Sequence, residues 1–371
     1  MKIRQLKLRY FRNYRNCTLQ FSDGIHIFHG KNAQGKTNLL EALLYLSTTR
    51  SHRTNRDIHL IQNEQSTFFI QGDIEKQNKR EILRVSVSSE GKNIFLFDKS
   101  IPNVSSFIGL FNAILFAPDD MHLFQASPKA RRKFIDMEMS KLSKTYMNTL
   151  NQALKLLKDR NMLFKRSQID QHYLNVLNEQ LAKLQAIIIR QRHFFIQKLA
   201  KKGNEYYQMI SQDQTTFDIE YLSCSEYDDQ SEVMVQALKE RYEKAFEKDM
   251  NLKMTTIGIH KEDYRFMIDG KAVELHASQG QKRSILLAFK LAMIDLFHEI
   301  SHEYPVLLLV DVFSELDQER RNRLFEILPM EVQVFIASAE IDYDYLKQLH
   351  RPITLWEIEA GQIKGKELVY G

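Results

Sequence analysis

Apolar residues recur at every second position in two stretches of the N-terminal third of the chain. Residues 3–10, 17–21 and 24–29 show this spacing first, and short runs between residues 67 and 97 show it again. Neighbouring side chains of a β-strand point to opposite faces, so the pattern predicts strands with one buried face. Charged turns and Gly91 separate the runs of the second stretch, which predicts an antiparallel sheet.

A helical pattern fills the middle of the chain. Residues 140–250 contain no proline and a single glycine, Gly203. Leucine and isoleucine recur there at steps of three and four residues, at Leu174, Leu177, Leu181, Leu184 and Ile188. This spacing predicts a short antiparallel arm or an inserted helical lobe, although an ordinary bundle core would give the same stripe.

The last third returns to alternating helices and strands. Residues 285–294 follow an apolar helical pattern, residues 305–310 are a continuous apolar run, and residues 332–337 form another apolar strand pattern. Such runs are typical of parallel strands buried on both faces. Helices alternating with buried strands predict an α/β fold class.

One stretch between a predicted strand and a predicted helix carries chemistry. It reads Gly30, Lys31, Asn32, Ala33, Gln34, Gly35, Lys36 and Thr37. It matches the phosphate-loop pattern G-x-x-x-x-G-K-[ST] and lies in the strand–loop–helix context that the pattern requires. The glycines let backbone N–H groups point into one concavity, and the helix N-terminus adds a positive dipole. A plain glycine turn with a solvated lysine would not explain the Lys-Thr pair at the first helical turn.

The predicted loop implies ATP and Mg²⁺ as cofactors. Lys36 would reach the β- and γ-phosphates, and the Thr37 hydroxyl would bind Mg²⁺. Asp311 directly follows the apolar run 305–310. Phosphate-loop enzymes place carboxylates that serve the metal or the attacking water at such a strand end. We therefore assign Lys36 and Asp311 to catalysis.

Composition narrows the class of protein. The chain has 371 residues, of which 43% are hydrophobic and 27% charged, as in globular proteins with a sizeable core. No apolar run approaches the ~18 residues needed to span a bilayer, and the N-terminus alternates like a strand rather than a signal peptide. Cys17 and Cys224 are too far apart in sequence for a zinc motif. We expect a cytoplasmic protein.

Two basic clusters are candidates for contact with DNA. The net charge of +5 permits nucleic-acid binding without requiring it. Arg53 follows the first predicted helix, and Arg131, Arg132 and Lys133 lie in a helix that opens with Ser-Pro. Each cluster is either a solvated surface or a phosphate-binding site, and Arg53 could equally serve the nucleotide.

Taken together, these segments resemble the RecF family of bacterial recombination-repair proteins, relatives of the SMC-type ABC ATPase heads. The resemblance covers nearly the whole chain and rests on residues 10–14, 30–38, 51–53, 115–120, 131–136, 278–281 and 314–317. It implies an ABC-type P-loop ATPase head with a flanking antiparallel sheet. Residues 1–138 would form its N-terminal part, 139–250 an inserted helical lobe or short arm, and 251–371 its C-terminal part.

The resemblance also implies an ATP-dependent homodimer. In that family Ser278, Gln279, Gly280 and Gln281 would contact the ATP held by the phosphate loop of the opposite copy. Amides at a helix start can bind a γ-phosphate, which is consistent with this role. The family's dimer closes on double-stranded DNA near single-strand gaps. It works with RecO and RecR in recombinational repair, replication restart and the SOS response, at the nucleoid, with weak DNA-stimulated ATPase activity.

Three segments depart from the family pattern. Val310 replaces an acidic residue beside Asp311, residues 258–263 read Gly-Ile-His-Lys-Glu-Asp instead of Gly-Pro-His-Arg-Asp-Asp, and residues 338–340 lack a threonine-rich run. These changes bear on ATP hydrolysis more than on ATP binding. An ATP-gated, non-hydrolysing DNA-binding module and another SMC-like ATPase therefore stay as alternatives. A nuclease of the OLD type ranks last because the chain ends soon after the ATPase core.

Overall fold

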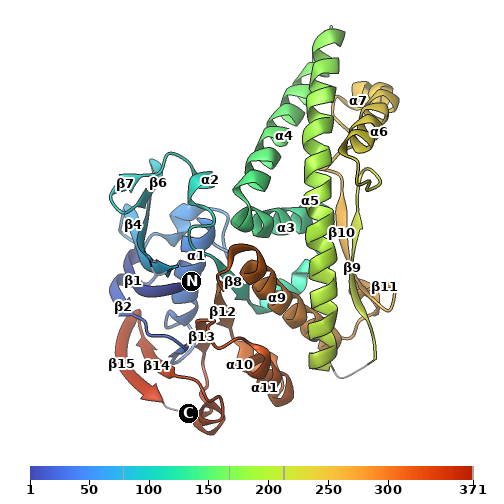
Figure 1. Cartoon of the computed structure of the whole chain (residues 1–371). Coiled ribbons are helices and arrows are strands. Elements are labelled where there is room, and N and C mark those ends of the chain that lie inside the picture. The colour runs from blue at the N-terminus through green and yellow to red at the C-terminus, as the bar shows by residue number, and fades with distance from the viewer. Residues whose placement is uncertain (78, 167, 212–213, 370–371) are drawn as a thin grey trace. The chain divides into compact units, whose positions relative to one another are not determined.

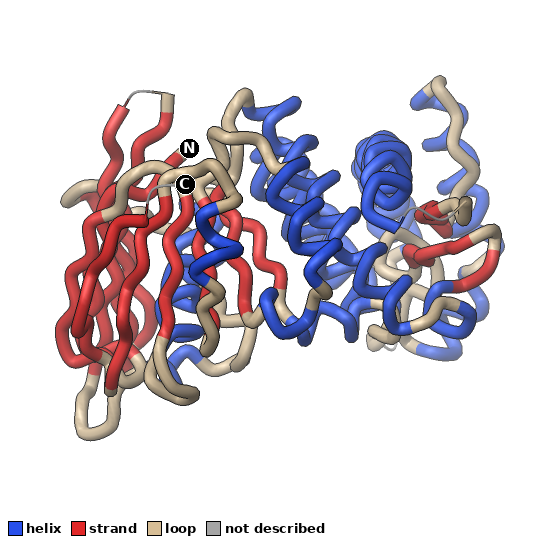
Figure 2. The backbone as a smooth tube through the Cα atoms, turned by 90° about the horizontal axis from the view of Figure 1, so that it is seen from below, coloured by secondary structure: helices blue, strands red, loops and turns tan. Residues whose placement is uncertain are grey.

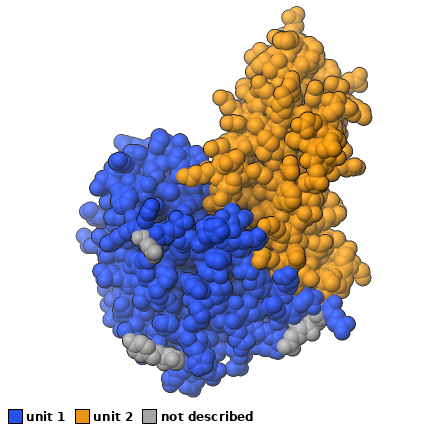
Figure 3. All heavy atoms as spheres, viewed as in Figure 1, with its two compact units in different colours: residues 1–121, 205–214, 279–371 blue, residues 122–204, 215–278 orange. Residues whose placement is uncertain are grey.

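The protein divides into two compact units. The computed structural model describes residues 1–77, 79–166, 168–211 and 214–369. Unit 1 comprises residues 1–121, 205–214 and 279–371, and unit 2 comprises residues 122–204 and 215–278 (Figure 3). The domain boundaries that we expected at residues 138 and 250 therefore both fall inside unit 2.

Unit 1 contains an antiparallel sheet of six strands, as the alternating pattern predicted (Figure 1). We call it the outer sheet. Its strands, in spatial order, are β2 (Tyr14–Gln20), β1 (Lys2–Phe11), β4 (Thr67–Lys76), β5 (Lys79–Ser88), β6 (Gly91–Leu96) and β7 (Lys99–Ser100). One face of β1, β2, β4, β5 and β6 carries buried apolar residues, because the side chains alternate.

The second sheet of unit 1 is largely parallel and contains the two predicted apolar strands of the last third of the chain. Its strands, in spatial order, are β15 (Gln362–Val369), β14 (Ile353–Glu359), β3 (Ile25–His29), β13 (Val334–Ser338), β12 (Val306–Val310) and β8 (Ala113–Phe116). Only the β14–β15 pair is antiparallel. All five residues of β12 and of β13 are buried, which is why these strands lack polar alternation.

The helices of unit 1 lie beside these two sheets (Figures 1 and 2). They are α1 (Lys36–Thr48), η1 (Asp57–Leu60), α2 (Val104–Phe107), α9 (Gln279–Ser301), α10 (Val312–Glu315), α11 (Gln318–Ile327) and α12 (Tyr343–Lys347), with η2 (Pro118–Leu123) at the unit boundary. One hydrophobic cluster joins the inner face of the outer sheet, α1 and the parallel sheet. Helix α1 is therefore clamped by apolar contacts to both sheets.

Unit 2 is mainly helical, as predicted for the middle of the chain. It contains α3 (Pro128–Leu142), α4 (Lys144–Leu163), most of α5 (Gln171–Ser211), α6 (Ser231–Lys244), α7 (Phe246–Leu252) and α8 (Val273–His276), with a small antiparallel sheet of β11 (Lys271–Ala272), β10 (Asp263–Ile268) and β9 (Phe217–Leu222). Leu174, Leu177, Leu181 and Ile188 of the predicted stripe are fully buried. Within the described ranges, no helix has both the length and the hydrophobicity to cross a membrane.

The α/β class with a flanking antiparallel sheet and an inserted helical lobe is thus confirmed. The lobe extends beyond its expected limits because α3 pairs with β10, far along the chain. Arg131 on α3 forms an ion pair with Asp263 on β10. A contact between residues so distant in sequence has no local pattern to predict it.

Candidate nucleotide-binding site

The predicted phosphate loop connects β3 to α1 in unit 1. Strand β3 is held between two parallel neighbours, β13 and β14, so the loop begins from a fixed strand end. Gly30 has a φ of 137°, and a Cβ there would lie 2.3 Å from the carbonyl oxygen of Ile358. Only glycine satisfies both conditions, so the first glycine of the motif lets the loop pass close to β14.

The second glycine opens the helix. Gly35 has a φ of 116° at the N-cap of α1, and no side chain caps the helix there. A Cβ at Gly35 would lie 2.7 Å from the Asn13 amide nitrogen. The first N–H groups of α1 therefore have no capping side chain, and with the helix dipole they form a site for an anion.

Lys36 is held inside the loop by neutral groups. Its ammonium donates hydrogen bonds to the carbonyl oxygens of Gly30 at 2.6 Å and Lys31 at 2.8 Å, and the residue is 5% exposed. Burial lowers the pKa of Lys36, and the charge of nearby Asp311 opposes that shift. A cation in this environment gains stabilisation when a phosphate takes over its hydrogen bonds.

The turn between β1 and β2 braces the loop from the side. The Asn13 amide donates to the Gln34 carbonyl oxygen at 2.8 Å, and the Tyr14 hydroxyl donates to the Gly35 carbonyl oxygen at 3.1 Å. Asn38 on α1 donates to Asn13 at 2.9 Å. In the sequence, residues 10–14 contribute only to the family resemblance, and nothing there predicts a role for Asn13 or Tyr14 at the phosphate loop.

Glu41 organises the other side of α1. Its fully buried carboxylate accepts a pair of hydrogen bonds from Arg12, at 2.7 and 2.9 Å, and another from Ser51. Arg53 lies 3.8 Å from the same carboxylate and donates to Asn38 at 3.0 Å. Arg53 thus borders the nucleotide side of α1. Burial lowers the pKa of its neighbour His52.

A groove of about 820 Å³ adjoins these residues in unit 1. Its lining includes Arg12, Asn13, Arg15, Asn38 and Arg53. It is therefore continuous with the residues that brace the phosphate loop, and its walls are polar and basic.

Val310 faces the core at the end of β12. Its neighbour along the register is Ala337 of β13, and it is 5% exposed within the hydrophobic cluster that includes residues of α1. Asp311 follows with a φ of 51°, and its N–H donates to the Ala337 carbonyl oxygen at 2.9 Å. The strand end therefore presents an isopropyl group toward α1 and a single carboxylate, Asp311, in the electrostatic range of Lys36.

The second predicted phosphate-binding segment starts a helix. Ser278 is the last residue of unit 2 and is exposed, and α9 begins at Gln279, followed by Gly280 and Gln281. Ser278 thus directly precedes the first helical residue, as the pattern predicted. The side chains of Ser314 and Glu315 lie outside the described residues.

Two of the three α3 residues that were predicted to contact DNA form hydrogen bonds within unit 2. Arg131 donates twice to the Asp263 carboxylate, at 2.6 and 2.8 Å, and Arg132 donates to the Glu262 carbonyl oxygen. Lys133 is exposed. Their guanidinium groups hold α3 to residues 262 and 263, and contact of Arg131, Arg132 and Lys133 with DNA stays a prediction.

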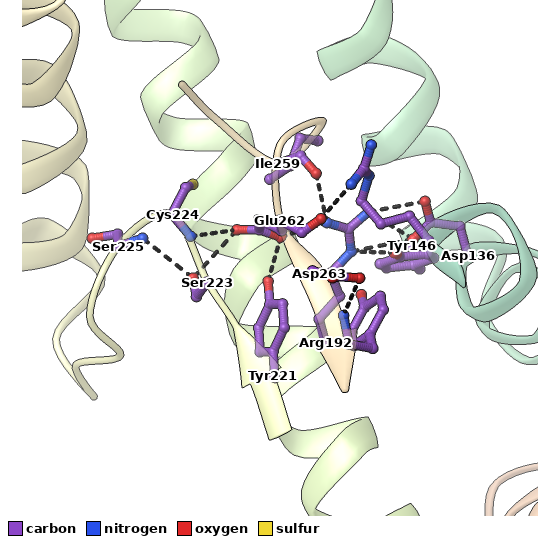
Figure 4. Close-up of polar contacts among 12 residues, drawn as sticks. Asp136, Tyr146, Arg192, Tyr221, Ser223, Cys224, Ser225, Ile259, Glu262 and Asp263 are labelled. Carbon is purple, nitrogen blue, oxygen red and sulfur yellow. Dashed lines mark hydrogen bonds and ion pairs between the residues drawn. The ribbon is translucent and has the colours of Figure 1, made fainter. Parts of the chain in front are cut away.

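Next to these contacts lies a buried ionic network (Figure 4). Arg192 on α5 donates to Asp136 at 2.7 and 2.9 Å and to Glu262 at 2.6 Å. Glu262 also accepts hydrogen bonds from the Tyr221 hydroxyl and the Cys224 N–H. The segment 258–263, noted for its departure from the family pattern, is thus part of the core of unit 2.

The site in unit 1 is that of a P-loop nucleotide-binding protein. Its phosphate-binding parts are a buried strand, a glycine loop with a buried lysine, and a helix whose N-terminus has no capping side chain. The family model described as the RecF/RecN/SMC N-terminal domain matches residues 2–361. The chain therefore belongs to the RecF/RecN/SMC family.

Two curated proteins named RecF are similar to this chain over nearly its whole length. The chain is 41% identical over 347 residues to a DNA replication and repair protein RecF from Pediococcus pentosaceus, covering 92% of this chain and 93% of that protein. It is 36% identical over 368 residues to a protein of the same name from Streptococcus suis, covering 99% of this chain and 100% of the relative.

Solved structures of a RecF protein and of an Smc head are similar to this fold. A structure of the recombination mediator protein RecF with ATP, in the RecFOR pathway, matches with a TM-score of 0.89 and 28% identity over 99% of both chains. An Smc head bound to the C-terminal winged-helix domain of ScpA matches with a TM-score of 0.57 at 14% identity, which shows a shared fold only.

Proposed function

We propose that this protein is an ATP-gated DNA-binding protein of the RecF type that acts in recombinational repair. The observation that carries the proposal is the state of Lys36, a buried cation whose two hydrogen bonds go to neutral carbonyl oxygens beside an uncapped helix. A nucleotide triphosphate supplies the negative charge that this arrangement lacks.

ATP would join two copies of the chain. The phosphate loop of one copy would hold the triphosphate, and exposed Ser278 with the start of α9 would contact the same nucleotide from the other copy. The RecF structures that match this chain belong to the RecFOR pathway. By that likeness, duplex DNA near single-strand gaps, RecO and RecR are the proposed partners, with localisation at the nucleoid.

The residues partly fit Mg²⁺. The Thr37 hydroxyl and the Asp311 carboxylate are oxygen donors of the kind that Mg²⁺ accepts, and the nucleotide would supply further oxygens. Buried Val310 adds no oxygen at the strand end. When bound, the ion would neutralise charge on the transferred phosphate. We therefore propose ATP binding with slow hydrolysis.

Light scattering after size-exclusion chromatography, with and without ATP and Mg²⁺, tests the gating. The wild-type chain should become a dimer with ATP. Lys36→Ala should lose nucleotide binding and stay a monomer. Ser278→Arg should bind ATP with normal affinity yet stay a monomer, because it changes only the surface offered to the other copy. Normal ATP-driven dimerisation of Ser278→Arg would contradict the shared site.

A further inference from the structure

Helix α11 follows the strand end that carries Asp311 and lies next to α9 (Figure 1). In the turn between them, buried Leu316 donates its N–H to the Val312 carbonyl oxygen at 3.0 Å. Asp317 then caps α11, because its carboxylate accepts the Arg320 N–H at 2.9 Å. The start of α11 is therefore fixed to the strand end by backbone and capping contacts.

The Arg320 guanidinium connects this turn to α9. One of its nitrogens, Nη1, is ion-paired with Asp317, and its Nε donates to the Ser284 hydroxyl at 2.9 Å. Ser284 lies in the second turn of α9 and is fully buried. A single side chain thus joins the capping residue of α11 to the helix that begins at Gln279.

The two contacts of Arg320 differ in kind. The Asp317 side chain is 51% exposed, and an exposed ion pair between neighbouring helical turns contributes little to stability. The hydrogen bond to Ser284 is stronger, because its acceptor is buried and its donor is charged. The planar guanidinium also fixes the direction of both contacts. The arrangement therefore sets the position of α9 relative to Asp317 more than it stabilises the fold.

Ser284 marks the point where α9 enters the core of unit 1. Gln279 is exposed, residues 280–283 are partly exposed, and residues 284–294 are buried. Gly280 and Ser284 are four positions apart, so they lie on one face of the helix, roughly 6 Å apart along its axis. Arg320 therefore contacts α9 where its exposed start meets its buried body, on the face that also carries Gly280.

The arginines of α11 contact different parts of unit 1. Arg320 reaches α9, and Arg321 lies over the ring of Tyr345 on α12, 5.5 Å from its centre. Arg323 donates to the Ile210 carbonyl oxygen at 2.7 Å, at the end of α5. Because α11 is held from several sides, the Arg320 side chain starts from a fixed backbone, and Arg323 provides a control residue on the same helix.

We propose that Arg320 is a positioning residue for the ATP site shared between two copies of the chain. By holding Ser284 to Asp317, it fixes the start of α9 in one orientation relative to the strand end that carries Asp311. This role rests on the proposed function, in which the start of α9 contacts the ATP of the other copy. The effect of Arg320 is indirect: its side chain sets how well residues 278–281 meet that ATP, and so how tightly two ATP-bound copies associate.

Light scattering of the full chain with ATP and Mg²⁺, over a series of protein concentrations, measures the dimer dissociation constant. Arg320→Gln and Ser284→Ala should each raise that constant about tenfold, the effect of losing one charge-assisted hydrogen bond. The double variant should also raise it about tenfold rather than about a hundredfold, because both substitutions break the same link. ATP affinity of the dilute monomer should stay unchanged, because Lys36 and the phosphate loop are intact.

Arg323→Gln is the matched control. It removes a cation and a hydrogen bond from the same helix, yet it should leave the dimer dissociation constant within about twofold of the wild-type value. The proposed role of Arg320 is overturned if Arg320→Gln leaves the constant unchanged, if the effects of Arg320→Gln and Ser284→Ala multiply in the double variant, or if Arg323→Gln raises it equally. A wild-type chain that stays monomeric with ATP would contradict the proposed function itself, and this role with it.

Discussion

Lys36 in unit 1 and Arg192 in unit 2 are both buried cations, but their partners differ in kind. Lys36 donates to two carbonyl oxygens, whereas Arg192, 1% exposed, donates to the carboxylates of Asp136 and Glu262. Carbonyl dipoles leave a net positive charge, and paired carboxylates cancel it. A buried cation among neutral groups therefore indicates a ligand site, and one among carboxylates indicates structure.

The same contrast separates the candidate DNA contacts. Arg131 forms an ion pair with Asp263, as Arg192 does with Glu262, whereas Lys133 is exposed. Contact with duplex DNA stays a prediction for Arg53, Arg131, Arg132 and Lys133. The sequence shows Arg131, Arg132 and Lys133 in one short stretch, and it cannot distinguish cations that form ion pairs from cations that stay exposed.

Breaking the network of unit 2 should have the largest effect. Arg192→Met leaves Asp136 and Glu262 without their partner, and removing one member of a buried ion pair costs about 3–5 kcal/mol. Urea denaturation should show that loss in the free energy of unfolding. Lys133→Met, an exposed cation of the same lobe, should change it by no more than about 0.5 kcal/mol. Similar losses in both variants would show that the network contributes no special stability.

The second prediction concerns the stability of unit 1 at low pH, which depends on a buried neutral histidine. His26 on β3 is fully buried; its Nε2 lies 3.0 Å from the Ser22 carbonyl oxygen and its Nδ1 accepts a hydrogen bond from Trp356. Burial lowers the pKa of His26 to about 4, so the folded state prefers the neutral ring. Stability should therefore fall as the pH drops from 6.5 toward 4, because the unfolded chain binds the proton first.

The size of the His26 effect is about 2–3 kcal/mol over that range. Urea denaturation at several pH values would measure it, and the His26→Gln variant should lose this part of the pH dependence. Parallel pH profiles for the two proteins would mean that His26 is not the titrating group.

Adding a carboxylate next to Asp311 gives a smaller but informative effect. Val310→Asp places an oxygen acceptor at the end of β12, where the family pattern has one. Single-turnover hydrolysis with ATP, Mg²⁺ and duplex DNA should become about tenfold faster, because charge stabilisation at the metal improves. Val310→Asn is the matched control, since it adds a polar group of similar size without charge. An unchanged or lower rate in Val310→Asp would show that Asp311 already serves the metal.

Local patterns predicted most of the fold. Alternation identified β1 and β4 to β6, and the apolar runs identified β12 and β13, because burial on one or both faces leaves its period in the sequence. The glycines of the phosphate loop were also predictable from the local sequence, because each has a positive φ that other residues rarely adopt. Gly35, for example, needs both its positive φ and its missing Cβ.

Contacts between distant segments were not predictable. Asn13 supports the loop across the β1–β2 turn, and Arg131 meets Asp263 across 132 positions of the chain. Neither pairing leaves a periodic trace, so the sequence could show the cations but not their partners. This is why the sequence could not show that α3 contacts β10 or that Arg131 forms an ion pair with Asp263.

The central claim is best tested by measuring ATP affinity and unfolding free energy on one pair of variants, Lys36→Met and Arg192→Met. We expect each substitution to lower mainly one of these two quantities. Lys36→Met should lose about 100-fold in ATP affinity, by calorimetric titration, with a smaller loss of stability than Arg192→Met, since the groups that lose their hydrogen bonds are neutral carbonyls. Arg192→Met should lose stability but bind ATP normally while folded. If Lys36→Met kept its ATP affinity, or if folded Arg192→Met lost it, the distinction between a ligand site and a structural ion pair would be contradicted.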